Sequence, residues 1–115
     1  MAARRILAMI VTRLAFGSLA ALTAVPANAA VKSDCDGPVC IAADIVRNTV
    51  NDATVSTTDG ANADLHIFIS NNVDRWKYNS RNFRTEVNRA YDSRTLVCGE
   101  AWARGHLLGR PCVRV

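Results

Sequence analysis

His106 is the residue in this sequence best suited to acid–base chemistry. Glu100 precedes it and Arg110 follows it within the same short stretch, and Glu86 is a second candidate carboxylate. A histidine and a carboxylate can act as general acid and base while arginines hold a phosphate group. One hypothesis is therefore a small secreted hydrolase that acts on phosphodiesters, with His106, Glu100 and Arg110 as its catalytic residues.

Two comparisons with known motifs limit this hypothesis. Small secreted ribonucleases use the same residue types, and residues 96–101 resemble a short part of the small microbial ribonucleases. This stretch does not carry the catalytic residues of those enzymes in the right order. A helical zinc site would need a second histidine four residues from His106, where Trp102 and Arg110 stand instead. The sequence therefore predicts no metal site and no cofactor. His66, the other histidine, is expected to be structural.

A second cluster combines aromatic and basic residues, namely Trp76, Tyr78, Arg81 and Arg84. These residue types dominate the binding energy of protein interfaces. They could also stack on bases and contact phosphates, but nucleic acid is the less favoured partner. We expect a non-enzymatic module that binds an unidentified protein or cell-envelope component through this strip, with the hydrolase as the alternative.

The beginning of the chain has the features of a secretory signal peptide. Three arginines precede or flank an apolar run over residues 14–25, Pro26 ends the run, and Ala27 and Ala29 provide the small residues that signal peptidase requires. The run is too short to cross a bilayer, which needs about 20 residues. We therefore expect Sec-type export, cleavage after Ala29, and a periplasmic or extracellular domain over residues 30–115 without a membrane span.

Removal of the leader would change the charge of the protein. The whole chain has 14 basic and 10 acidic residues, and three of the basic ones lie in residues 1–29. The remaining domain would be nearly neutral, with an acidic first half and a basic second half. Such asymmetry makes a dipolar molecule, or two patches that screen each other in one small domain.

Four cysteines in an exported chain favour two disulfides. The sequence favours Cys35–Cys40, across a short turn with glycine and proline, and Cys98–Cys112, across a longer hairpin. A pairing that joins the N-terminal cysteines to the C-terminal ones is the main alternative.

Hydrophobic spacing predicts a mixed fold. Residues 39–50 and residues 80–92 show apolar positions at helical spacing. Residues 53–58 and 63–70 are expected to form a hairpin, residues 71–79 a loop, and residues 95–102 and 112–115 two further strands. The predicted fold class is α+β: a small disulfide-bridged domain with two helices packed on a short antiparallel sheet.

Overall fold

The computed structural model describes residues 29–115, and this part of the chain is all-β. The leader predicted over residues 1–29 lies, apart from its last residue, outside the described residues. Residues 29–115 form nine strands: β1 (Ala29–Asp36), β2 (Val39–Val46), β3 (Thr49–Thr57), β4 (Ala63–Ile69), β5 (Val73–Ser80), β6 (Asn82–Ala90), β7 (Leu96–Ala103), β8 (His106–Gly109) and β9 (Cys112–Arg114). Residues 29–115 contain no helix that could cross a membrane.

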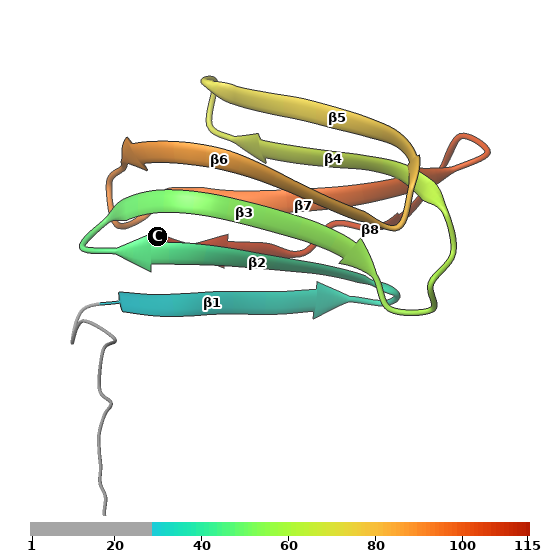
Figure 1. Ribbon diagram of the computed structural model, residues 1–115, viewed down its shortest axis with the longest axis horizontal. Helices are drawn as coiled ribbons and strands as arrows, with labels where there is room; N and C mark the ends of the chain where they lie inside the picture. Colours follow the sequence, from blue (N-terminus) through green and yellow to red (C-terminus); the bar gives the residue numbers. More distant parts are fainter. Residues whose placement is uncertain (1–28) are drawn as a thin grey trace, which may run out of the picture.

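The strands form two antiparallel sheets that pack face to face (Figure 1). One sheet has the order β1-β2-β3-β6. The other has the order β5-β4-β7-β8, with β9 also paired to β7. In Figure 1, β5 runs along the upper margin of the molecule with β4 as its neighbour, far from β1.

The predicted α+β class is wrong, and residues 39–50 show why. Val39, Ile41, Ala43 and Ile45 are buried at every second position, which is the period of a strand. Arg47 and Asn48 have φ angles of 49° and 66°, as a two-residue hairpin turn requires, so the chain reverses there. Over so short a segment, the apolar spacing fits both the period of a strand and the period of a helix. Pairing with β1 and β3 selects the strand.

The second predicted helix, residues 80–92, is also a strand. Phe83, Thr85 and Val87 turn toward the interior at alternate positions of β6, which pairs with β3. The preceding segment, expected to be a loop, forms β5. The strand expected over residues 63–70 is confirmed as β4, and the expected pairing of the two C-terminal strands is confirmed between β7 and β9.

The hairpin expected over residues 53–70 does not form. Strand β3 pairs with β2 and β6, whereas β4 pairs with β5 and β7 in the other sheet. Residues 58–62 therefore carry the chain from one sheet to the other.

The interior between the sheets is aliphatic. The largest fully buried side chains are isoleucine, leucine and valine, together with Pro111. Gly99 lies where β7 approaches the facing sheet, and a Cβ atom there would come within 2.8 Å of the Val55 side chain. In the described part of the chain, no phenylalanine, tyrosine or tryptophan is fully buried. Phe83 and Tyr91 pack against the margin of this core, whereas Trp76 and Tyr78 are exposed.

Two disulfides link neighbouring strands: Cys35–Cys40 joins β1 to β2, and Cys98–Cys112 joins β7 to β9. This is the pairing that the sequence favoured. Disulfides persist in oxidising compartments, so they indicate an exported environment.

The Cys98–Cys112 disulfide is expected to stabilise the fold more than Cys35–Cys40. It closes the longer loop, with a sequence separation of 14 against 5. Replacing both of its cysteines by serine should lower the free energy of unfolding by about 3 kcal/mol, against about 2 kcal/mol for the shorter loop. Urea unfolding of the two double variants measures both values, and equal losses would contradict this order.

Candidate functional site

The outward face of the β5-β4-β7 sheet carries an unusual set of side chains. Alternation along β4 buries Leu65 and Ile67 and turns His66 and Phe68 outward. His66 lies directly opposite Trp76 on β5 and directly opposite Glu100 on β7. Strands β4 and β5 are consecutive in the chain and β7 comes later, and together they bring a histidine, a tryptophan and a carboxylate into one row.

His66 is held between two carboxylates. Its Nδ1 lies 2.8 Å from Glu100 Oε1, and its Nε2 lies 2.5 Å from Asp74 Oδ1. Both ring nitrogens are therefore occupied, and neither is available as a general base or as a metal ligand in this arrangement.

Glu100 is the centre of this network. Its side chain is 7% exposed, and it accepts hydrogen bonds from His66, from Trp102 Nε1 at 3.1 Å, and from Arg110 Nε at 2.5 Å. Burial by itself would raise the pKa of Glu100, but the three hydrogen bonds and the Arg110 charge outweigh it and lower the pKa below its ordinary value. Glu100 is thus a buried, ionised acceptor that links β4, β7 and the segment before β9.

Four rings stack across β5 and β4, and we call this set the aromatic ladder: Tyr78, Trp76, His66 and Phe68. The Trp76 and His66 rings are nearly parallel with centroids 4.0 Å apart. Tyr78 stacks on Trp76 at 5.9 Å, and Phe68 stacks on His66 at 5.0 Å. The rings cover one another's faces, and Trp76 and Tyr78 remain 40% and 67% exposed.

The structure divides the binding strip that the sequence suggested. Trp76 and Tyr78 belong to the aromatic ladder. Arg81 is exposed in the turn between β5 and β6. Arg84 lies on β6 in the other sheet, where its Nη2 donates to Asp52 Oδ2 at 2.7 Å. The two aromatic residues and Arg84 therefore do not form one surface.

The structure also divides the suggested catalytic set. Glu100 and Arg110 are hydrogen-bonded, but the imidazole beside them is that of His66. His106 pairs with Ala103, and alternation along β7 places that pair on the opposite face of the strand from Glu100. Within residues 29–115, His106 has no hydrogen bond to a carboxylate. Glu86 is exposed on β6, where it pairs with Arg84.

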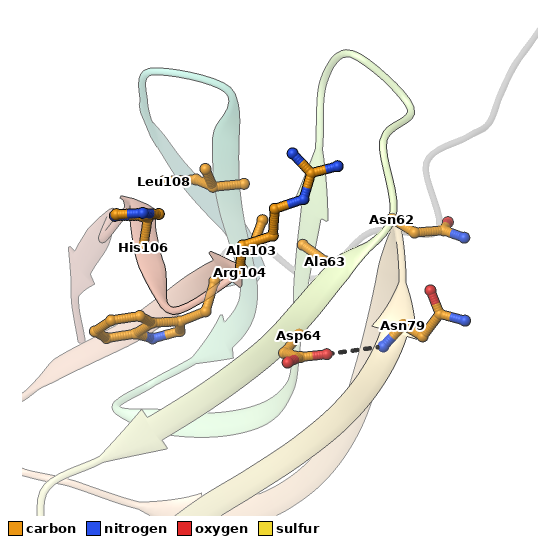
Figure 2. A pocket seen from close by; sticks show the side chains of 9 residues that line it. Asn62, Ala63, Asp64, Asn79, Ala103, Arg104, His106 and Leu108 are labelled. Atoms are coloured by element: carbon orange, nitrogen blue, oxygen red, sulfur yellow. Dashed lines mark hydrogen bonds between the residues drawn. The ribbon is translucent and has the colours of Figure 1, made fainter.

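His106 instead borders a shallow hollow of about 460 Å³ at one end of the sandwich. Figure 2 shows His106 and Leu108 on one side of this hollow, and Asp64 and Asn79 on the other. The Asp64 carboxylate accepts a hydrogen bond from the backbone N–H of Asn79 at 3.1 Å. Trp102 also lines the hollow and donates to Glu100, so the hollow adjoins the His66 network, although His106 itself has no hydrogen bond to that network among the described residues.

Sequence reasoning missed His66 as a site residue. The apolar alternation around it was visible, but its two carboxylate partners are 8 and 34 residues away. Nothing in the local pattern marks those partners, because the sheet register alone brings them together.

Comparison with known proteins finds no match: no protein-family model, no curated protein and no solved structure resembles the chain. The fold and the site define a small, disulfide-bridged β-sandwich with a network of charged and aromatic side chains on one outer face. Among the described residues, no group of three or more histidine, cysteine, aspartate and glutamate side chains is placed to hold a metal ion.

Loss of the Glu100 charge should make the protein less stable and less sensitive to acid. The pKa of Glu100 is lower in the folded state than its ordinary value of 4.5, so the ionised carboxylate stabilises the fold at any pH above 4.5. This stabilisation is lost as the pH falls through the lower folded-state pKa. Glu100→Gln should reduce the free energy of unfolding by about 3 kcal/mol at pH 7, because His66 and Arg110 lose their shared negative charge and one of the two acceptor oxygens is replaced by an NH2 donor.

Denaturant titrations between pH 7 and pH 2 measure this effect. Glu86→Gln, which removes a carboxylate that is 67% exposed, is the matched control and should leave the pH 7 stability nearly unchanged. If Glu100→Gln lost stability on acidification as steeply as the wild type, the assigned role of Glu100 would be wrong.

Proposed function

We propose that this chain is a non-enzymatic, exported binding module that recognises a protein partner through the outward face of β4 and β5. The observation that carries the proposal is the aromatic ladder. In a domain whose core is aliphatic, Trp76 and Tyr78 stand in solvent on a margin of a sheet. Burial in the core does not account for them, whereas a partner that covers them would.

The ladder has the properties of a binding hot spot. Tryptophan and tyrosine contribute large contact areas at interfaces and are enriched among the residues that dominate binding energy. Here the rings are already ordered, because Trp76 stacks on His66 and two carboxylates hold His66 in place. Ordering before binding reduces the conformational entropy lost on association.

A protein fits this face better than a nucleic acid or an envelope polysaccharide. Ligands of those classes stack on open aromatic faces. In the ladder, the faces by which the four rings contact one another are covered by the neighbouring ring, so a base or a sugar cannot stack on those faces. The ring edges and the outer face of Tyr78 remain, and they suit the side chains of a protein surface.

The geometry supports binding better than phosphodiester hydrolysis. A general base needs a free nitrogen within reach of its substrate. His66 has both nitrogens engaged by carboxylates, and His106 lies apart from Glu100 and Arg110. The two disulfides and the leader-like first residues favour a periplasmic or extracellular place of action.

Site-specific photocrosslinking tests this proposal. Tyr78 would be replaced by benzoylphenylalanine, which keeps an aromatic ring, and the protein would be irradiated with the exported and envelope fractions of the producing cells. One discrete protein adduct is expected. The same group at Val31, which is 71% exposed on β1, is the control and should not form it.

Competition then separates specific from adventitious capture. Unlabelled wild type should suppress the adduct, and Trp76→Ala should need about tenfold more protein to do so. Arg84→Ala should compete as well as wild type, because Arg84 lies on the other sheet. Equal competition by Trp76→Ala, or a polysaccharide in the adduct, would overturn the proposal.

A further inference from the structure

Strand β5 is an open margin of its sheet. It stands at the end of the order β5-β4-β7-β8, and within residues 29–115 its backbone pairs only with β4. Six consecutive residues, 74–79, are exposed, although alternation should bury every second one. The strand therefore extends beyond the facing sheet and presents both faces and one edge to solvent.

Three other strands lie at sheet margins. Strand β6 has nine residues and, within residues 29–115, pairs only with β3, but it carries no tryptophan or tyrosine, and its Phe83 and Val87 pack against the core. The remaining two margins are shorter or are joined to another part of the fold. Lys32 on β1 donates hydrogen bonds from Nζ to the carbonyl oxygens of Arg114 and Val115, which joins that margin to the C-terminal strand. Strand β8 has four residues against eight in β5. Sheet margins without such protection are templates for an additional strand.

The two faces of β5 differ in chemistry. Trp76 and Tyr78 project from the outward face as part of the aromatic ladder. Arg75 and Lys77 lie opposite Ile67 and Leu65, so they project from the inward face. Arg75 donates to Thr85 Oγ1 on β6, whereas Lys77 has no hydrogen bond or ion pair in the described part of the chain.

This arrangement disfavours a second copy of the chain. Antiparallel pairing of two β5 strands would bring Arg75 and Lys77 of each copy to the same face, and like charges opposite each other are destabilising. The same two cations would favour acidic residues at alternate positions of an added strand. The outward aromatic residues would favour apolar side chains at the positions between them.

We infer that the protein partner adds an extended segment with alternating acidic and apolar residues to the free edge of β5. Its acidic side chains lie beside Arg75 and Lys77, and its apolar side chains lie beside Trp76 and Tyr78. This inference rests on the proposed function and specifies the mode of binding: main-chain hydrogen bonds provide affinity, and the two alternating rows provide selectivity.

Titration of the isotopically labelled protein with an eight-residue Val-Glu repeat peptide tests this inference by NMR. Shift changes are expected at the amides of residues 73–80, together with slower hydrogen exchange in β5. The same peptide N-methylated at every residue keeps its charges but lacks backbone donors, and a Val-Lys repeat reverses the charge. Both control peptides should bind at least tenfold more weakly.

Lys77→Glu is the matched protein variant, because Lys77 is exposed and without a partner among residues 29–115. It should weaken the Val-Glu peptide about tenfold and strengthen the Val-Lys peptide. Equal binding of the N-methylated peptide would show charge attraction without strand addition and would overturn the inference. A Tyr78 crosslink that persists when the Val-Glu peptide fails to protect β5 would overturn strand addition alone and leave the proposed function standing.

Discussion

The buried carboxylate of Glu100 is the interaction on which the outward face of this domain depends. It accepts hydrogen bonds from His66 on β4, Trp102 on β7 and Arg110 before β9. A buried charge is costly unless its hydrogen-bonding capacity is satisfied, so these partners hold one another in place. His66 is thereby fixed in orientation, and Trp76 has a rigid surface to stack on.

Aliphatic, cysteine and aromatic side chains have different structural roles in this arrangement. Aliphatic residues fill the space between the sheets, and the disulfides fasten strands at two places. The rings of the aromatic ladder lie on the outward face, where His66, held by Glu100 and Asp74, stacks on Trp76. A sheet margin with two cations, Arg75 and Lys77, lies beside this ordered aromatic face, and both nitrogens of the imidazole at Glu100 lie within hydrogen-bonding distance of a carboxylate.

Parts of this structure could be predicted because their signals are local. Strand β4 was evident from the alternation around Ile67, and the two disulfides follow from cysteines near each other in the chain. Strands β2 and β6 were mistaken for helices because their apolar residues fit both a period of two and a period of 3.6 over so few residues. The sequence predicts one binding strip with Trp76 and Arg84 because the two are close in the chain, whereas the structure places Arg84 on the other sheet.

The sequence by itself determined residue chemistry, the favoured disulfide pairing, the charge asymmetry and the alternation that buries one side of β4. Only the tertiary structure decided which sheet each strand joined and which histidine met Glu100. The physical reason is register: His66 and Glu100 are 34 residues apart, and they meet because β4 pairs with β7 in one alignment. A shift of one residue would turn His66 and Glu100 to opposite faces of the sheet, so the site exists only in the assembled sandwich.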